Sequence, residues 1–302
     1  MCRLIGAVDI GGTKILAGIV DEAGHVLCED YVQTPVGKGG AEQASQIIAG
    51  LLHELTRSIG VDIMNLEGVG IVCAGPVDSS KGIVENPYTL PGWNGFPLAR
   101  RLTELTRRIV KIENDVNGAV LGEVFLNRLD GNRVLMIAFG TGIGVAACNC
   151  GKLYTTGGRY HPEMGHTIVA DEGPECYCRH RGCFESLWSG AAINRRAIEM
   201  GYESFDDLFL NMKSGEQKSV NFMNHASRQL SNGIWNLLTV FNPDVLILGG
   251  GFMNKYYDYA YEIIRKDIDG LPDFVENLRV MKANTANNSA LVGASILIYQ
   301  GK

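Results

Sequence analysis

The feature that most constrains the fold is a strand, a glycine-rich turn and a second strand, a pattern that occurs twice. The first copy comprises Leu4 to Ile10, a turn at Gly11 and Gly12, and Ile15 to Val20. The second comprises Arg133 to Phe139, a turn from Gly140 to Gly144, and Val145 to Cys150. We interpret this recurrence as an internal duplication, and it predicts two lobes that each open on a β-turn-β unit.

Helices and strands alternate through the rest of the chain, which predicts an α/β fold. After a third strand at Val26 to Val32, the expected helices are Ala41–Ser58, Leu98–Arg108, Asp115–Asn127, Ser186–Met200, Phe205–Met212, Gln217–Phe241, Asn254–Asp267 and Ser289–Tyr299. The expected later strands are Val69–Cys73, Val110–Glu113, Val245–Leu248 and Leu278–Lys282. We assign residues 1–114 to a small lobe, joined by the C-terminal helix 288–302, and residues 115–287 to a large lobe.

Composition excludes several classes of function. The chain has 302 residues, of which 46% are hydrophobic and 20% charged, and its net charge is −6. It therefore lacks the basic character of a nucleic-acid-binding domain. Its apolar runs are too short to span a bilayer, and the N-terminal run ends at Asp9, too early for a secretory signal. We expect a cytoplasmic protein that contacts neither nucleic acid nor membrane.

The first glycine turn has the residues of a phosphate-binding loop, Asp9-Ile10-Gly11-Gly12-Thr13-Lys14. Glycines let the backbone approach a phosphate, and Thr13 and Lys14 can donate to its oxygens. Asp9 can hold Mg²⁺, directly or through water. A plain β-hairpin turn explains the glycines equally well. The chain contains no Walker A motif.

Two further glycine turns strengthen the phosphate-binding interpretation. The turn from Gly140 to Gly144 lacks the spacing of the dinucleotide fingerprint and precedes a strand, which argues against an NAD enzyme. Gly249-Gly250-Gly251 follows a buried strand and precedes a helix, a weak nucleotide signal by itself. Three such turns in one chain indicate nucleotide binding more strongly than any one of them does.

Polar residues cluster at a predicted strand-to-helix junction, Glu113-Asn114-Asp115-Val116-Asn117. Sites in α/β sheets collect at the carboxyl ends of strands. There Asp115 can take the proton of an attacking hydroxyl while Asn114 fixes a sugar. Alternatively, Asp115 only caps the helix as its N-cap residue.

The cysteines indicate a metal. Without a signal peptide, disulfides are improbable, and three of the eight cysteines crowd together. His166 with Cys176, Cys178 and Cys183 forms the Cys₃His set of structural zinc sites, with His180 as the rival fourth ligand. Glu163 and Glu185 flank this cluster and suit a hydroxyl-rich ligand, although solvated surface glutamates would have the same pattern.

Taken together, these motifs resemble the ROK family (repressors, open reading frames, kinases) of the actin-like ATPase and sugar kinase superfamily. The specific part is Pro162–His166 followed by Cys176–Glu185, which is similar to the family elements G-E-x-G-H and C-x-C-G-x-x-G-C-x-E. The resemblance covers nearly the whole chain, from Asp9 to the last helix.

The resemblance implies a two-lobed actin-like (ribonuclease H-like) fold, an active-site cleft between the lobes, and an ATP-dependent hexose kinase with Asp115 as general base. It implies Mg-ATP, a structural zinc in the loop 161–185, a hexose as partner, and a homodimer. The implied sugar-binding residues are Gly75, Asn114, Asp115, Glu163, His166 and Glu185. The implied ATP-binding residues are Asp9, Gly11, Gly12, Thr13, Lys14, Gly140, Thr141, Gly142, Gly144, Gly249, Gly250 and Gly251.

This chain also departs from the family pattern. Arg179 stands where the family usually has glycine, so the backbone there must avoid a positive φ or accept strain. His161-Pro162 replaces the common Ala-Gly pair, as in some fructokinases, and Phe241–Met253 is similar to allose kinase. The loop Pro91–Leu98 is similar to glucose-type kinases, so we expect glucose, phosphorylated at O6, with allose, fructose or N-acetylmannosamine as alternatives. A sugar-sensing repressor of the same family is the non-enzymatic alternative, but only eight residues precede Asp9.

Overall fold

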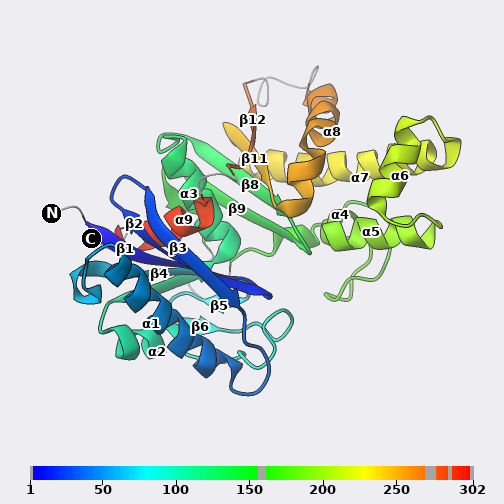
Figure 1. Ribbon diagram of the computed structural model, residues 1–302. Coiled ribbons are helices and arrows are strands. Elements are labelled where there is room, and N and C mark those ends of the chain that lie inside the picture. The colour runs from blue at the N-terminus through cyan, green and yellow to red at the C-terminus, as the bar shows by residue number, and fades with distance from the viewer. Residues whose placement is uncertain (1–2, 156–160, 269–276, 285–287, 300–302) are drawn as a thin grey trace. The chain divides into compact units, whose positions relative to one another are not determined.

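A computed structural model describes residues 3–155, 161–268, 277–284 and 288–299 (Figure 1). The chain divides into two compact units. The first contains residues 1–131, 146–162 and 284–302, and the second contains residues 132–145 and 163–283. Both units combine sheet and helix, which confirms the predicted α/β class.

The first unit is built on a five-stranded sheet in the order β3-β2-β1-β4-β7. The strands are β1 (Leu4–Ile10), β2 (Lys14–Asp21), β3 (Val26–Gln33), β4 (Leu66–Cys73) and β7 (Val110–Asn114). β1 to β3 form an antiparallel meander, whereas β1, β4 and β7 run parallel. The register pairs Ile10 with Cys73 and Cys73 with Asn114, so these parallel strands end in one row.

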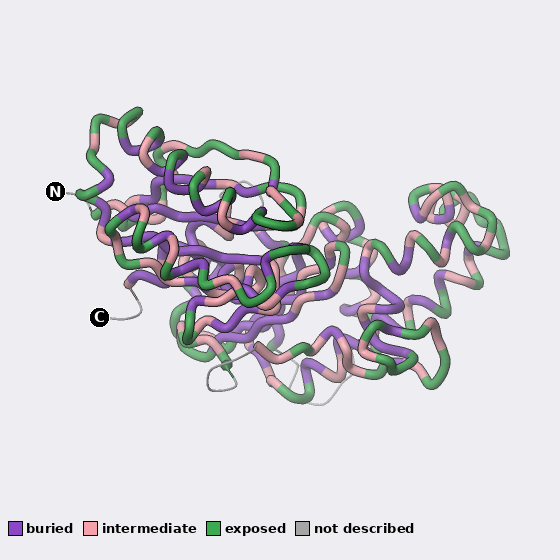
Figure 2. The backbone as a smooth tube through the Cα atoms, turned by 90° about the horizontal axis from the view of Figure 1, so that it is seen from below, coloured by how far each residue is buried: buried purple, intermediate pink, exposed green. Residues whose placement is uncertain are grey.

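Helices cover both faces of this sheet (Figure 1). α1 (Gly40–Ser58) and α2 (Leu98–Thr106) pack on one face, and α3 (Asp115–Leu126) and α9 (Ser289–Tyr299) pack on the other. Short elements connect them, namely η1 (Ile63–Asn65), β5 (Val77–Asp78) and β6 (Ile83–Val84). Apolar residues of α1 such as Ile48 and Leu52 are fully buried in the core of this unit. Figure 2 colours the buried residues of the chain purple.

Glycines bring α3 and α9 unusually close together. A Cβ on Gly293 would overlap the carbonyl of Gly118, and a Cβ on Gly122 would overlap the carbonyl of Ser289. The two helix backbones therefore touch, which fixes α3 and its first residue against the C-terminal helix. This packing is the physical reason why α3 belongs to the first unit, whereas the sequence prediction began the second lobe at Asp115.

The second sheet has the order β10-β9-β8-β11-β12. Its strands are β8 (Arg133–Phe139), β9 (Ile143–Asn149), β10 (Lys152–Leu153), β11 (Val245–Gly249) and β12 (Arg279–Lys282). The helical elements of the second unit are η2 (Met164–His166), α4 (Phe184–Trp188), α5 (Gly190–Glu199), α6 (Phe205–Lys213), α7 (Gln217–Phe241) and α8 (Gly251–Ile268). β11 runs parallel to both β8 and β12.

Most predicted elements are confirmed, with two corrections. The single helix expected over Ser186–Met200 is two helices, because Ser189 has an extended backbone (ψ 154°) and its side chain caps α5 by accepting the Ala192 N–H. α8 begins at Gly251 rather than Asn254, so the third glycine turn leads directly into the helix. None of the helices in the described ranges has the length and apolar character that a membrane span requires.

Candidate active site and metal centre

The first glycine turn is a tight hairpin between β1 and β2. The Gly11 N–H donates to the Lys14 carbonyl at 2.9 Å, and Thr34 Oγ1 donates to the Gly11 carbonyl at 2.7 Å. Thr13 and Lys14 stay exposed, with Lys14 Nζ 4.3 Å from the centre of the Tyr31 ring. Hydrogen bonds therefore hold the turn at Gly11, while Thr13 and Lys14, the two predicted phosphate donors, are exposed to solvent.

Asp9 lies at the end of β1, beside the start of α3. Burial raises the pKa of Asp9 to about 7, the charge of Asp115 raises it further, and Lys14 opposes both effects. Two neighbouring carboxylates disfavour each other's ionisation unless a cation compensates them. This pair is consequently a suitable place for a divalent cation that accompanies a phosphate.

The start of α3 corrects the predicted helix cap. Asn114, not Asp115, is the N-cap residue, and its side-chain oxygen accepts the N–H groups of Val116 at 3.0 Å and Asn117 at 3.3 Å. Asp115 is the first helical residue, and its Oδ1 accepts the Val116 N–H at 2.9 Å. Glu113 braces the junction by accepting the Asn114 N–H at 2.8 Å. The capping task thus falls to Asn114.

Asp115 has a perturbed acidity. Burial raises its pKa, and the Val116 N–H and the nearby His161 lower it in part. His161 also packs at this position, because a Cβ on Gly75 would lie 2.7 Å from Asn114 Nδ2 and 3.3 Å from His161 Cε1. In the sequence, His161 was recognised only as a departure from the family pattern, and no role was predicted for it. Its place beside Asp115 depends on a long-range contact that no local pattern encodes.

The second and third glycine turns meet in the second unit. Gly250 has φ +89°, and a Cβ there would overlap the backbone of Phe139, directly before the second turn. The Gly190 N–H donates to the Gly140 carbonyl at 2.8 Å. α5 and α8 therefore both begin at the second glycine turn, and helix N-termini favour anions.

Glu185 and Glu163 lie near this turn in the second unit. The Ile143 N–H donates to Glu185 Oε2 at 2.7 Å, so one carboxylate oxygen is held by the turn. Burial raises the pKa of Glu163, the Glu185 charge raises it further, and His166 opposes this. Both glutamates thus lie within electrostatic reach of one another, and Glu163 also lies within reach of His166.

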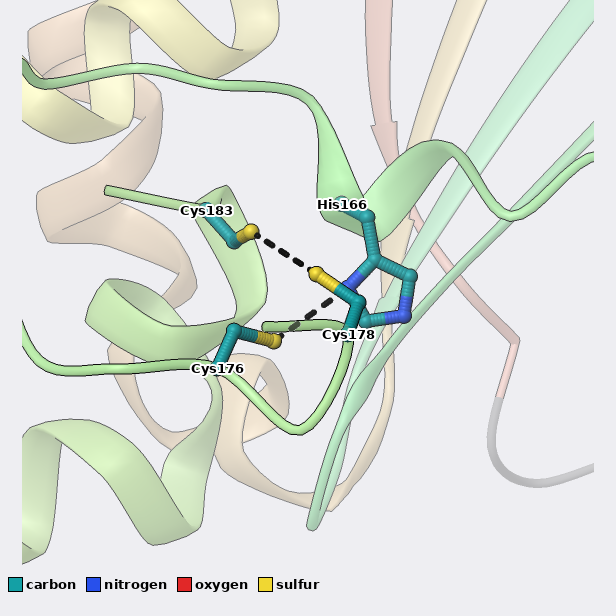
Figure 3. A group of neighbouring side chains, drawn as sticks. All are labelled: His166, Cys176, Cys178 and Cys183. Atoms are coloured by element: carbon teal, nitrogen blue, oxygen red, sulfur yellow. Dashed lines mark hydrogen bonds between the residues drawn. The ribbon is translucent and has the colours of Figure 1, made fainter. Parts of the chain in front are cut away.

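The predicted metal ligands come together. His166, Cys176, Cys178 and Cys183 have ligand atoms that all lie within 4.8 Å of one another (Figure 3). His166 Nδ1 lies 3.4 Å from Cys176 Sγ, and Cys178 Sγ lies 3.5 Å from Cys183 Sγ. His180 does not belong to this group and approaches Cys178 alone, with Nδ1 3.7 Å from its sulfur.

The donor set fits zinc. Metal–ligand distances of about 2.0 to 2.3 Å in a tetrahedron place neighbouring donors roughly 3.5 Å apart, and the sulfur and nitrogen separations above have this size. Burial and the adjacent thiols raise the pKa of Cys183 to about 12. Without a cation Cys183 therefore stays a neutral thiol, and three thiolates side by side would form only around a cation; zinc prefers this combination of sulfur and nitrogen.

Arg179 in the metal loop has a positive φ, which is the strained alternative for this position. Its φ is +71°, so this arginine takes the left-handed conformation that the family usually gives to glycine. The conformation is fixed by a turn in which the Arg179 N–H donates to the Cys176 carbonyl at 2.8 Å. The loop therefore accepts local strain at one residue.

The chain is similar over nearly its whole length to proteins of one known family. The sequence profile of the ROK family matches residues 5–301, and the chain belongs to the ROK family. Among its relatives, a glucokinase of Thermotoga maritima is 30% identical over 317 residues, covering 99% of this chain and 98% of its own. An N-acetylmannosamine kinase of Vibrio cholerae is 30% identical over 291 residues, covering 96% and 97%.

Solved structures agree with this assignment. The ROK hexokinase from Thermus thermophilus has a TM-score of 0.84 at 29% identity and covers 99% of both chains. A ROK family glucokinase from Streptomyces griseus, solved in complex with glucose and AMPPNP, has a TM-score of 0.75 at 29% identity over 100% of both chains. The fold is accordingly that of the ROK sugar kinases, with their actin-like ATPase architecture.

Proposed function

We propose that this protein is an ATP-dependent hexose kinase in which Asp115 is the general base. The observation that carries the proposal is the position of Asp115, at the end of the parallel strands and beside Asp9, with burial raising its pKa. A base whose pKa is raised toward neutrality accepts a hydroxyl proton more readily. The kinases among the ROK relatives support the same activity.

In the proposed reaction a sugar hydroxyl attacks the γ-phosphorus of Mg-ATP. The new oxygen–phosphorus bond forms as the bond to the β-phosphate oxygen breaks, ADP leaves, and Asp115 takes the hydroxyl proton. Asp9, Thr13 and Lys14 with the three glycine turns would position the phosphates and adenosine. Most of the rate enhancement in phosphoryl transfer comes from such positioning and from charge stabilisation.

The sugar would be held by Gly75, Asn114, Glu163, His166 and Glu185. Glucose is the proposed substrate because the loop Pro91–Leu98 is similar to glucose-type kinases and a glucokinase is among the relatives. In the structure this loop is anchored by Trp93, which is fully buried and donates through Nε1 to the Pro35 carbonyl at 2.8 Å. N-acetylmannosamine is the second candidate, because a kinase for it has the same identity to this chain.

We further propose that the Cys₃His group holds a structural zinc, which keeps the segment bearing Glu163, His166 and Glu185 in shape. Metal analysis should find about one zinc per chain, because a closed site of four protein ligands binds tightly. Cys176→Ala should lose the metal and weaken sugar binding. Zinc-free wild-type protein with full sugar affinity would contradict the structural role. The homodimer and the cytoplasmic location stay predictions.

Replacement of the proposed base tests the mechanism. Asp115→Asn should lower kcat by about 10²- to 10⁴-fold, the usual contribution of general-base catalysis, while sugar binding is largely retained. The measurement is ADP release, coupled to a detection enzyme, with glucose, mannose, fructose, allose, N-acetylglucosamine and N-acetylmannosamine. Asp258→Asn, at an exposed residue of α8, is the matched control. Near-normal kcat in Asp115→Asn would overturn the assignment of the base.

The alternative of a non-enzymatic regulator makes a different prediction for the same assay. A ROK transcriptional regulator shares the fold, with a TM-score of 0.82 at 20% identity, so the fold alone does not separate the two functions. The retention of Asp9, Lys14 and Asp115 favours the kinase. Absence of turnover on every sugar would favour the regulator.

A further inference from the structure

Tyr177 occupies a position that the proposed mechanism does not use. It lies between the metal-site residues Cys176 and Cys178, and its hydroxyl is 2.8 Å from His166 Nε2. The two rings pack edge to face, with 4.8 Å between their centres and an angle of 84°. The phenol is thus aimed at His166 and does not extend freely from the loop.

The same hydroxyl reaches the carboxylates of the cluster. The side chain of Glu185 is a second hydrogen-bond partner of the Tyr177 hydroxyl, and the Glu163 carboxylate lies within electrostatic reach of it. One protein hydroxyl therefore contacts His166 and Glu185 and lies near Glu163. These are three of the residues proposed to hold the sugar.

The nitrogen that Tyr177 engages is the one that a sugar needs. His166 Nδ1 faces Cys176 Sγ at 3.4 Å, on the metal side, so Nε2 is the nitrogen left for a ligand. A phenol hydroxyl can donate one hydrogen bond and accept others, and a sugar hydroxyl has the same capacity. A sugar hydroxyl in this place could form the same hydrogen bonds to His166 and Glu185 as the phenol does.

Resting on the proposed function, we propose that the Tyr177 hydroxyl takes the place of a sugar hydroxyl in the free protein and that the sugar binds by displacing it. Tyr177 would then influence both the affinity and the selectivity for sugars. Only a sugar whose hydroxyl bonds to both His166 and Glu185 would replace the two hydrogen bonds that are broken when Tyr177 leaves. The displacement is sterically possible, since Tyr177 is 63% exposed and can turn toward solvent without opening a cavity in the core.

The hydrogen bond between Tyr177 and His166 could instead support the metal site. A histidine that binds a metal usually donates its second N–H to a partner that fixes the ring, and Tyr177 would be such a partner. In that case removal of the hydroxyl weakens metal binding. Under the displacement proposal, removal leaves the metal in place and strengthens sugar binding.

The experiment compares wild-type protein with Tyr177→Phe, which removes only the hydroxyl. We expect the sugar KM to fall about threefold to tenfold, the factor that corresponds to one hydrogen bond, with kcat changed less than about twofold. Zinc content and zinc retention against a chelator should match wild type. Calorimetric titration with the sugar alone should show the same gain in affinity. Tyr261→Phe, at a tyrosine of α8 outside this cluster, is the matched control.

The outcomes separate the two proposals. An unchanged or higher KM in Tyr177→Phe, with an active wild type, overturns the displacement alone. Loss of zinc from Tyr177→Phe assigns Tyr177 to the metal site and also overturns it. A wild-type protein that neither phosphorylates nor binds any sugar overturns the proposed function, and the displacement with it.

Discussion

Asn114 and Asp115 are adjacent residues that divide two tasks. The Asn114 side chain satisfies the first N–H groups of α3, which leaves Asp115 as a helical residue whose Oδ1 accepts the Val116 N–H. An aspartate that also served as N-cap would direct its oxygens into the helix. Because Asn114 caps the helix, Asp115 does not have to serve as the N-cap residue, and its place in the first turn of α3 fixes its position.

Arg179 provides a test of backbone strain. Its φ of +71° costs a residue with a Cβ roughly 1–2 kcal/mol. Glycine would remove this strain, but it also loses more conformational entropy on folding, which cancels part of the gain. Arg179→Gly should therefore raise the free energy of unfolding by about 0.5–1 kcal/mol, measured by urea titration.

The control for this substitution is Arg195→Gly, at an exposed arginine inside α5. It should lower the free energy of unfolding by about 1 kcal/mol, because glycine disfavours helix interiors. If both substitutions destabilise the protein alike, the positive φ of Arg179 is not a source of strain.

At the scale of elements, the glycines of α3 and α9 make a sharp prediction. A Cβ on Gly293 would overlap the Gly118 carbonyl, so Gly293→Ala should lower the free energy of unfolding by about 1–3 kcal/mol through overpacking. Thermal or urea denaturation measures the change. Gly50→Ala, on α1 where a Cβ meets nothing within 4 Å, should instead stabilise by up to about 1 kcal/mol. Equal effects at the two positions would refute close helix packing as the cause.

Local sequence patterns predicted most elements but not how their side chains meet. α7 and α9 were predicted at their exact bounds. For α7, an apolar stripe and the following Pro243 define these bounds. The break at Ser189 was missed, since serine also occurs within helices and its capping geometry depends on the chain beyond it.

The candidate site shows the same division. Its residue types could be read from motifs, and the four predicted metal ligands do meet. The contact of Tyr177 with His166 and the bond from the Ile143 N–H to Glu185 could not be read, because they join residues distant in sequence. Motif positions specify the chemistry available, whereas tertiary packing decides which groups face one another.

For the whole molecule, Asp9 couples stability to pH. Its pKa is 3.8 in the unfolded reference and about 7 in the folded protein, so between these values the folded state holds a proton that the unfolded state has lost. Asp9 thus contributes stability that is complete below the unfolded pKa and is lost as the pH rises through about 7. The slope is at most about 1.4 kcal/mol per pH unit.

Urea titrations between pH 5 and pH 8, without nucleotide, measure this coupling. Asp9→Asn should reduce the decrease of the free energy of unfolding with pH by a slope that corresponds to about one proton. Asp258→Asn should leave this slope as in wild type. A wild-type stability that rises steadily across this range would contradict the raised pKa. The expected cost of an ionised Asp9 is the reason that a bound cation would stabilise the folded protein most above neutral pH.

The close packing of α9 also bears on how the protein is made. α9 follows the entire second unit in sequence, yet it covers β1 and β4 of the first sheet and touches α3 backbone to backbone. On the ribosome, the first sheet must therefore wait for α9, which is made after the second unit, before the apolar face that this helix covers is removed from solvent. The second unit emerges during that interval and can fold earlier. A nascent chain of this kind would offer chaperones a hydrophobic surface that vanishes only when the last helix docks.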